Sequence, residues 1–263
     1  ALSHATHGIG VASGTDALLL PLKALDIAPG DEVITSTFTF FASAGAIHNA
    51  GAKPVFVDVD PATYNLDPVA VEAAITPRTR AIMPVHLFGQ MAAMERLVPT
   101  AKEHGLAIIE DACQAIGARR KVSGEWRTAG ELGRATAFSF FPSKNLGGWG
   151  DGGMVVTSDE GMAQRVRRLR THGGMKTYHH DEVGTNSRLD ALQAAVLIAK
   201  LPYLQSWSEA RRAHAAWYSK ALAGIAGVRA PSTDPANEHI FHQYVIEADR
   251  REALQEHLKA GGI

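Results

Sequence analysis

The sequence predicts an α/β fold in which a mostly parallel sheet is sandwiched between helices. Short, almost continuously apolar segments alternate along the chain with amphipathic helical segments, a pattern typical of repeated β-α units. Strands that are apolar on both sides need cover on both sides, so we expect helices on both faces of the sheet. The length of 263 residues suits one large domain and part of another.

Each expected strand of the first part is a short apolar run, and each expected helix has apolar residues at helical spacing. Asp67-Pro68 is a helix start signal, and Gly51 and Gly105 are stop signals. In chain order, these elements are strand Ile9–Ala12, helix Asp16–Leu25, strand Glu32–Ser36, helix Thr39–Asn49, strand Pro54–Asp58, helix Asp67–Ile75, strand Arg80–Val85, helix Met91–His104 and strand Leu106–Asp111.

The rest of the chain continues this pattern and then changes. Further strands are expected at Ala135–Phe140 and Met154–Thr157, and a long helical stretch runs from Asp190 to about Leu222, interrupted near Pro202. After a Gly- and Pro-containing loop, we expect a strand over His239–Glu247 and a helix over Arg250–Lys259. Residues 1–222 are thus expected to form a large domain, and 223–263 the start of a small α+β domain. Both are expected to be incomplete.

Composition and simple motifs exclude several classes of function. The net charge of −1 gives no electrostatic reason to expect a nucleic acid or membrane partner, and no apolar run reaches membrane-spanning length. Cys113 is the only cysteine, so no internal disulfide forms and a reducing cytoplasm is compatible. No HExxH or paired-ligand spacing predicts a metal site, and neither GxGxxG nor a Walker A sequence is present.

Lys144 is the most informative single residue. It lies between an aromatic strand end, Phe138–Phe141, and a glycine-rich run that extends to Gly153. Dehydration there favours a neutral, nucleophilic amine, which can attack an aldehyde as lysines do when they hold pyridoxal 5′-phosphate (PLP). A solvated loop lysine is the alternative for this residue taken alone.

Polar residues at the ends of the predicted strands suit the same cofactor, because ligands bind beyond the carboxyl ends of such strands. Asp111 ends an apolar strand and could pair with a protonated pyridine nitrogen, which keeps the PLP ring an electron sink. Gln114 could donate a hydrogen bond to the ring oxygen, and Ser139 could add a hydroxyl to a phosphate site. The alternative for Asp111 is that it caps a following helix.

Two further segments complete the pattern. Ser13-Gly14-Thr15 lies between a strand and a helix, where helical amides suit a phosphate, although an ordinary N-cap by Ser13 or Thr15 is the alternative. Phe38-Thr39-Phe40-Phe41 opens the next predicted helix, and one ring there could stack on a flat cofactor. We expect the other two phenylalanines to pack in the core.

These residues belong to stretches that resemble the DegT/DnrJ/StrS sugar aminotransferases, PLP enzymes of fold type I. The agreement in order and spacing extends along almost the whole chain. The matching stretches are Val11–Leu18, Gly51–Asp58, Pro84–Gln90, Glu110–Gln114, Phe138–Phe140 with Lys144 and its glycines, and Gly184–Ala195.

The resemblance implies a role for each matched residue. Lys144 would be the Schiff-base lysine and proton carrier, Asp111 the partner of the pyridine nitrogen, and Gln114 the partner of the ring oxygen. Phe40 would stack on the ring. The implied phosphate-site residues are Gly14, Thr15 and Ser139, together with Asn186, which would reach the neighbouring subunit's phosphate in a homodimer with shared active sites. His86 lies in a recurring family motif without a firm role.

The resemblance therefore implies a cytoplasmic PLP-dependent aminotransferase that moves an amino group from an amino acid, with glutamate expected, to a nucleotide-linked keto-sugar. Related sugar dehydratases have histidine in place of the lysine, so Lys144 disfavours that branch. Two alternatives stay open: a non-catalytic PLP-binding regulatory relative, and an inactive fragment of the aminotransferase.

Overall fold

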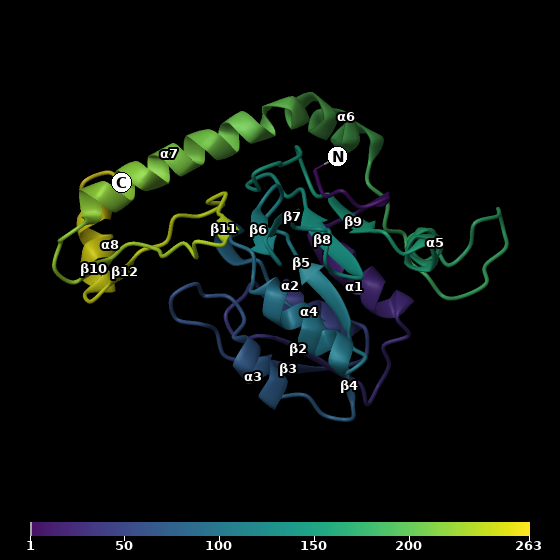
Figure 1. Ribbon diagram of the computed structural model, residues 1–263. Helices are drawn as coiled ribbons and strands as arrows, with labels where there is room; N and C mark the ends of the chain where they lie inside the picture. Colours follow the sequence, from purple (N-terminus) through teal and green to yellow (C-terminus); the bar gives the residue numbers. More distant parts are fainter. Residues whose placement is uncertain (1) are drawn as a thin grey trace.

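The computed structural model describes residues 2–263 and is built around a seven-stranded sheet of order β1-β9-β8-β5-β4-β2-β3 (Figure 1). Its strands are β1 (His7–Val11), β2 (Glu32–Ser36), β3 (Lys53–Val57), β4 (Thr79–Met83), β5 (Ala107–Asp111), β8 (Ala135–Ser139) and β9 (Gly153–Thr157). The run from β3 to β8 is parallel, whereas β9 is antiparallel to both of its neighbours. The predicted mostly parallel sheet is confirmed.

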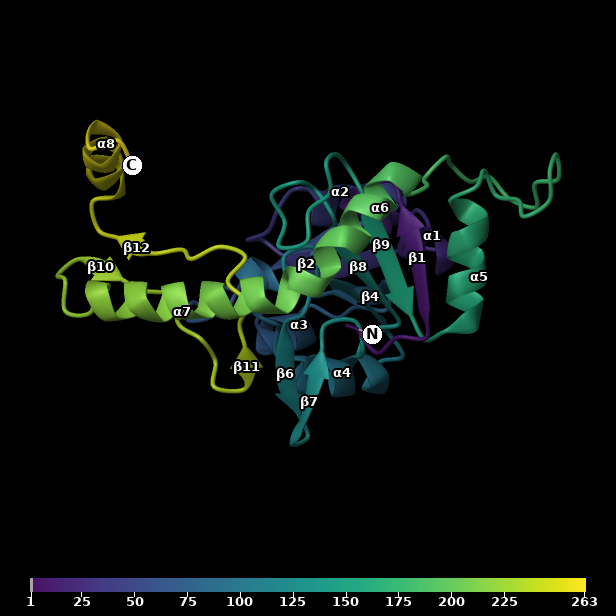
Figure 2. The same ribbon diagram turned by 90° about the horizontal axis from the view of Figure 1, so that it is seen from above.

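Helices cover both faces of this sheet. One buried cluster joins the strands to α1 (Gly14–Ala24), α2 (Ala42–Asn49) and α5 (Glu160–Leu169), and another joins them to α3 (Pro68–Ala73) and α4 (Met94–Glu103). Neighbouring residues of β5, Ile108 and Ile109, belong to opposite clusters because successive side chains of a strand point to opposite faces. Figure 2 shows α1 and α2 on one side of the strands and α3 and α4 on the other.

The segment between β2 and α2 differs from the expectation. α2 begins at Ala42 rather than Thr39. Phe38, Phe40 and Phe41 are 48%, 71% and 80% exposed, so the expectation that two of these rings pack in the core is wrong. The hydroxyl of Ser36 accepts a hydrogen bond from the Phe38 N–H and donates one to its carbonyl, which holds this segment as a bend instead of a helical turn.

A hairpin of β6 (Arg119–Val122) and β7 (Glu125–Thr128) was not expected from the sequence. Its turn residues Ser123 and Gly124 have φ values of 52° and 85°, as a two-residue hairpin turn requires. β11 (Asn237–Glu238) pairs with β6 to complete a three-stranded sheet. The basic cluster of Arg165, Arg167, Arg168 and Arg170 was expected at a solvated helix end, but the bounds of α5 were not predicted, although Asp159 is a good N-cap signal and accepts a hydrogen bond of 2.9 Å from the Met162 N–H.

The long helical stretch is confirmed as α6 (Ala191–Lys200), a 3-10 turn (Leu201–Tyr203) containing Pro202, and α7 (Leu204–Leu222). In Figure 1, α7 leads away from the main sheet toward β10 (Val228–Arg229), β12 (Glu247–Ala248) and α8 (Arg251–Ala260).

The predicted strand His239–Glu247 is wrong, because only its last residue lies in a strand. Contacts outside a ladder hold this backbone instead. The Arg211 guanidinium donates to the carbonyls of Phe241 and His242, and the Ile240 N–H donates to the Gly89 carbonyl.

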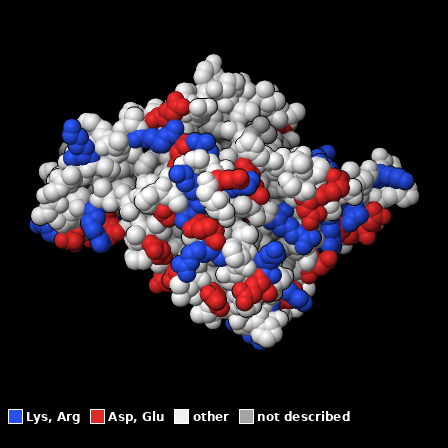
Figure 3. Space-filling view, in the orientation of Figure 1, with Lys and Arg blue, Asp and Glu red and all other residues white. Residues whose placement is uncertain are grey.

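Features typical of metal and membrane proteins are not found in the described chain. Among residues 2–263, no helix combines the length and apolar character needed to cross a bilayer, and no cluster of three metal-binding side chains occurs. Positive and negative side chains are interspersed on the face shown in Figure 3.

Candidate functional site

The predicted site residues gather at one edge of the sheet. β2, β4, β5 and β8 run parallel, so their carboxyl ends share this edge, and β1 joins them because it is antiparallel to β9 as β8 is. Asp111 ends β5, Ser139 ends β8, and Gly14 follows β1 by three residues.

Gly14 and Ser139 lie in close contact. A β-carbon added to Gly14 would lie 2.6 Å from Ser139 Cβ, 2.9 Å from its hydroxyl oxygen and 3.2 Å from the Cys113 sulfur. Only glycine therefore fits between α1 and the end of β8. This close approach is what a phosphate site shared by the start of α1 and Ser139 requires.

The first turn of α1 leaves amides available. Ser13 has extended backbone angles, and its hydroxyl accepts a hydrogen bond from the Asp16 N–H at 3.1 Å. The N–H groups of Gly14 and Thr15 belong to the first turn and have no carbonyl partner within the helix. The expected alternative, an N-cap by Ser13, is thus correct, and it coexists with amides that suit an anion.

Asp111 is a buried carboxylate, 5% exposed, held by two donors. The Ser43 hydroxyl donates to Oδ2 at 2.7 Å, and the Cys113 N–H donates to Oδ1 at 3.2 Å. No ion pair of residues 2–263 includes Asp111, so the structure leaves this buried charge without a cationic partner. A protonated pyridine nitrogen suits it. The helix-cap alternative is wrong, because no helix lies between β5 and β6.

Gln114 is held in one orientation. The Phe88 N–H donates to its side-chain oxygen at 2.7 Å. Phe88 has a φ of 56°, in the left-handed region where an aromatic residue is unusual. Since the amide oxygen is occupied, the NH2 group of Gln114 is the part left to donate to a ligand.

Lys144 is half-buried in the loop that follows β8, and its N–H donates to the Phe141 carbonyl at 2.9 Å. Within residues 2–263, its amine takes part in no hydrogen bond or ion pair. The Lys144 charge acts on two neighbours. Burial and the Asp111 charge raise the pKa of the Cys113 thiol well above its ordinary value, and Lys144 opposes them. Burial, then Lys144 and Arg211, lower the pKa of His242 to about 4.

α6 shapes the glycine-rich loop after Lys144. The Trp149 N–H donates to Gln193 Oε1 at 2.7 Å, and the Lys200 amine donates to the Gly147 carbonyl. A β-carbon on Gly148 would lie 2.6 Å from Gln193 Oε1, so a larger residue there would displace the Gln193 side chain from its bond to Trp149. The loop that presents Lys144 is therefore fixed from the neighbouring helix.

Asn186 does not join the other predicted residues within one chain. It is exposed in the segment between α5 and α6, part of which projects from the sheet in Figure 2, and its side-chain oxygen accepts a hydrogen bond from Arg188 at 3.1 Å. The next residue, Ser187, is fully buried. Its hydroxyl donates to Asp16 Oδ2 at 2.7 Å and accepts the Ala12 N–H at 3.1 Å.

Phe40 lies in the bend before α2, with its ring largely exposed. Its carbonyl accepts the Ser43 N–H at 3.2 Å, and Ser43 is the residue that donates to Asp111. Phe40 is therefore connected to Asp111 through one intervening residue. An exposed ring in this position is free to stack on a flat ligand.

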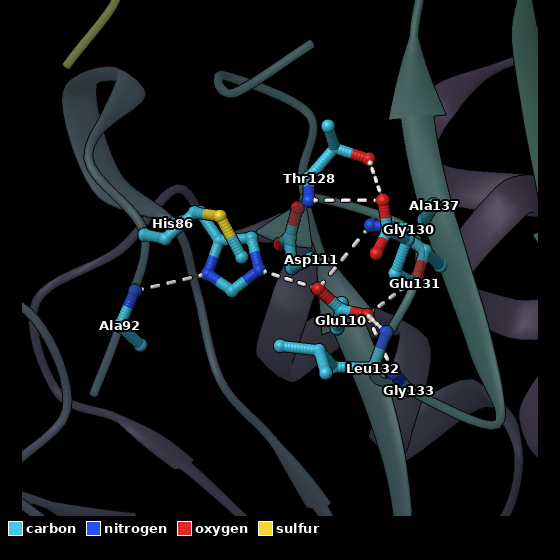
Figure 4. Close-up of polar contacts among 12 residues, drawn as sticks. His86, Ala92, Glu110, Asp111, Thr128, Gly130, Glu131, Leu132, Gly133 and Ala137 are labelled. Atoms are coloured by element: carbon cyan, nitrogen blue, oxygen red, sulfur yellow. Dashed lines mark hydrogen bonds and ion pairs between the residues drawn. The ribbon is translucent and has the colours of Figure 1, made fainter. Parts of the chain in front are cut away.

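His86 is fully buried behind the site (Figure 4). Its Nδ1 accepts the Ala92 N–H at 3.2 Å, so Nε2 carries the proton that is donated to Glu110 at 2.8 Å. Burial raises the pKa of Glu110, but hydrogen bonds from His86, Gly133 and Thr136 outweigh it and leave that pKa below the ordinary value. The main-chain N–H of His86 also donates to the main-chain carbonyl of Asp111 at 2.9 Å.

The residues present fit PLP on three structural grounds: the Gly14 approach to Ser139, the unpaired Asp111 carboxylate and the oriented Gln114 amide. Sequence reasoning missed Ser43 and Phe88, which hold Asp111 and Gln114. It also missed His242, whose Nδ1 lies 2.9 Å from the side-chain oxygen of Asn145 next to Lys144. For Ser43, a hydroxyl close after the proposed stacking residue was the available signal.

The comparisons with known proteins agree along the full chain. The model of the DegT/DnrJ/EryC1/StrS aminotransferase family matches residues 1–263. A "pleiotropic regulatory protein" of Geobacillus stearothermophilus is 54% identical over 265 residues, covering 100% of this chain and 70% of the relative. A UDP-N-acetyl-3-dehydro-alpha-D-glucosamine 3-aminotransferase of Acidithiobacillus ferrooxidans is 50% identical over 262 residues, again covering 100% and 70%.

Two solved structures superpose on this chain along nearly its whole length. DesV of Streptomyces venezuelae, in complex with a ketimine intermediate, superposes with a TM-score of 0.96 at 48% identity, covering 100% of this chain and 70% of that one. NtdA of Bacillus subtilis, with the cofactor PMP bound, superposes with a TM-score of 0.86 at 32% identity, covering 96% and 57%.

Proposed function

Because the chain belongs to the DegT/DnrJ/EryC1/StrS aminotransferase family, we propose that it transfers an amino group from an amino acid, with glutamate as donor, to a nucleotide-linked keto-sugar. The observation that carries the proposal is a half-buried Lys144 amine in the loop after β8, beside the strand end that holds the buried Asp111 carboxylate. Among the described residues neither group has a charged partner, so the pair suits a cofactor with an aldehyde and a protonated ring nitrogen.

We assign the cofactor-binding roles to residues that the fold brings to the sheet edge. Asp111 would hold the ring nitrogen of PLP, Gln114 its ring oxygen, and the Phe40 ring would cover its face. The phosphate would lie against Gly14, Thr15 and Ser139, where first-turn amides of α1 and a hydroxyl meet.

Lys144 would carry the proton between the α-carbon of the amino donor and the cofactor. PLP, when bound, supplies an electron sink that stabilises negative charge at that carbon. The Lys144 backbone is fixed by the Phe141 carbonyl and its loop by Gln193, so the amine has a limited range of positions, as proton transfer requires. Asp111 would keep the proton on the ring nitrogen.

The names of the relatives support the sugar substrate. The Acidithiobacillus protein is named for a UDP-linked amino sugar, and a Streptomyces venezuelae relative, 49% identical over 257 residues, for a dTDP-linked one. We therefore propose that the acceptor of this chain is a keto-sugar linked to UDP or dTDP. A cytoplasmic location, compatible with the single Cys113 thiol, is part of the same proposal.

We also propose a homodimer with shared active sites. Asn186 is exposed in the segment between α5 and α6, and among the described residues its side chain is hydrogen-bonded only to Arg188, which leaves it accessible to a second subunit. The same segment exposes Tyr178 and Val183 almost completely, which suits contact with a second copy. Residues 1–222 would form the PLP-binding domain, with 223–263 as the start of the smaller one.

A cofactor test decides the Lys144 assignment. Adding PLP is expected to give an absorbance band that borohydride converts to a stable adduct, and peptide mass mapping is expected to locate the adduct on Lys144. Lys144→Arg, which keeps the charge but does not form the bond, is expected to lose the adduct while retaining the fold by circular dichroism. An adduct that persists in Lys144→Arg would show that another lysine binds the cofactor.

A turnover test separates the enzyme from a regulatory PLP-binding protein, an alternative favoured by the names of two relatives, the Geobacillus "pleiotropic regulatory protein" and a "sensory transduction protein" of Saccharopolyspora erythraea. The protein loaded with pyridoxamine phosphate is mixed with UDP- and dTDP-linked keto-sugars, and amino-sugar formation is followed by mass spectrometry. Stoichiometric amination in a single turnover is the expected result. Bound cofactor without amination of any member of the panel would support the regulatory alternative.

A further inference from the structure

Two hydroxyl groups link the bend before α2 to the proposed ring-nitrogen partner. Thr39 Oγ1 lies 2.8 Å from Ser43 Oγ, and Ser43 Oγ lies 2.7 Å from Asp111 Oδ2. Ser43 is fully buried in the first turn of α2, and Thr39 is half-buried in the preceding bend. Neither hydroxyl has a role in the function proposed above.

The chain of hydrogen bonds has one direction. A charged carboxylate only accepts, so the single hydroxyl proton of Ser43 is donated to Asp111. The bond between the two hydroxyls is then donated by Thr39. The Phe40 carbonyl, 3.3 Å from Ser43 Oγ, does not compete, because the bond to Asp111 is shorter and charge-assisted.

We propose that Ser43 is a positioning residue that fixes the Asp111 carboxylate against the cofactor ring nitrogen, and that Thr39 orients Ser43. The inference rests on the proposed function, in which Asp111 holds that nitrogen. With Ser43 on Oδ2 and the Cys113 N–H on Oδ1, the carboxylate cannot rotate without breaking a hydrogen bond. Hydrogen-bond donors to a carboxylate also favour its charged form, so the proton between Asp111 and the ring nitrogen stays on the nitrogen.

The arrangement has a second effect, on the ring-stacking side chain. Thr39 and Ser43 flank Phe40 in the sequence, and the Phe40 carbonyl accepts the Ser43 N–H. The residue proposed to cover the face of the ring and the residue proposed to hold its nitrogen are therefore fixed by the same short segment.

A purely structural role for Ser43 is the competing explanation, because any donor to a buried carboxylate stabilises the fold. The test therefore needs a signal from the cofactor itself. The protein is loaded with PLP labelled with ¹⁵N in the ring, and the ¹⁵N chemical shift, which distinguishes protonated from unprotonated nitrogen, is recorded across a pH series. PLP affinity is measured in parallel by titration of the absorbance.

Ser43→Ala is expected to move the ¹⁵N signal toward the unprotonated position and to weaken PLP binding by about tenfold, which is the effect of losing one hydrogen bond to a charged group. Ser43→Thr keeps the hydroxyl and is expected to restore the wild-type signal. Thr39→Val is expected to give a smaller shift in the same direction. Ser208→Ala is the matched control, since Ser208 is a buried helical serine that donates to the Leu204 carbonyl in α7.

The outcomes distinguish an error in the Ser43 proposal from an error in the Asp111 assignment. If Asp111→Asn changes the ¹⁵N signal while Ser43→Ala and Thr39→Val leave the signal and PLP affinity at wild-type values, Asp111 holds the nitrogen and the Ser43 proposal is wrong. If Asp111→Asn also leaves both measurements unchanged, the assignment of Asp111 itself is wrong and the inference fails with it. Should Ser43→Ala not fold, Thr39→Val and Ser43→Thr still decide the question.

Discussion

Replacing Gly14 by alanine tests the phosphate site, because it adds one methyl group where α1 meets β8. The new β-carbon would lie 2.6 Å from Ser139 Cβ and 2.9 Å from its hydroxyl oxygen, well inside van der Waals contact. The Gly14 backbone is outside the left-handed region, so alanine itself is compatible with the helical conformation. The clash must therefore move Ser139 or the start of α1.

The magnitude follows from two opposing effects. Overpacking a well-packed site costs about 2 kcal/mol, and replacing glycine by alanine in a helix contributes about 0.5–1 kcal/mol of stability. The net loss of about 1 kcal/mol corresponds to a Tm lower by roughly 2–4 °C. A shift of Ser139 or of the α1 amides also removes at least one hydrogen bond to the phosphate, so PLP affinity is expected to fall at least about tenfold.

Thermal unfolding of the PLP-free protein and absorbance titration with PLP measure the two effects separately. Gly161→Ala is the matched control, since Gly161 also lies in a first helical turn and its added β-carbon would meet only Asp159 Oδ1, at 3.2 Å. Adding Ser139→Gly to Gly14→Ala removes the two closest atoms and leaves only the Cys113 sulfur at 3.2 Å, so the double variant is expected to recover part of the Tm but not the PLP affinity. Wild-type PLP affinity in Gly14→Ala would refute the phosphate site.

Three further predictions concern the surroundings of the site. Glu110→Gln removes a buried carboxylate whose pKa is held below its ordinary value by His86 and main-chain amides, so the unfolding free energy measured with urea at pH 7 is expected to fall by about 3 kcal/mol. The difference from wild type is expected to shrink as the pH is lowered, and a difference under about 1 kcal/mol at pH 7 would contradict the prediction. Burial lowers the pKa of His239 from 6.5 to about 4, so the unfolding free energy is expected to fall by up to about 3 kcal/mol as the pH is lowered from 6.5 to 4. His239→Asn is expected to flatten the curve of unfolding free energy against pH in this range, and an unchanged slope would count against the prediction. Gln193→Ala is expected to speed hydrogen exchange at the Trp149 amide with little change elsewhere, and protection equal to wild type would show that the loop is held by other contacts.

The sheet and most of its helices could be predicted, because their apolar periodicity and cap residues are local signals. Asp67, for example, is the N-cap of α3 and accepts the Val69 N–H. The family resemblance predicted the site residues, and the structure brings Gly14, Asp111 and Ser139 to one edge of the sheet. Their roles stay predictions until a cofactor is bound.

The remaining features depend on contacts between distant segments, which no local pattern reveals. The apolar residues of His239–Glu247 resemble a strand, yet their backbone groups bond to Arg211 and Gly89 instead of a neighbouring strand. The orientation of Gln114 depends on Phe88, 26 residues away, whose left-handed backbone has no sequence signature. The hydroxyl of Ser43, three residues after Phe40, was visible in the sequence, but its bond to Asp111 depends on the packing of α2 against β5.

The hydrogen bond between Ser187 and Asp16 gives the proposed dimer a property that neither subunit has alone. Asp16 lies in the first turn of α1, beside the proposed phosphate amides, and Ser187 directly follows Asn186. The turn proposed to bind one phosphate is thus tied to the residue next to the side chain proposed to reach the other subunit. If the proposed dimer forms, a change at the phosphate turn of one subunit is therefore expected to reach the cofactor site of the other, and absorbance titration with PLP is expected to depart from the curve for independent sites.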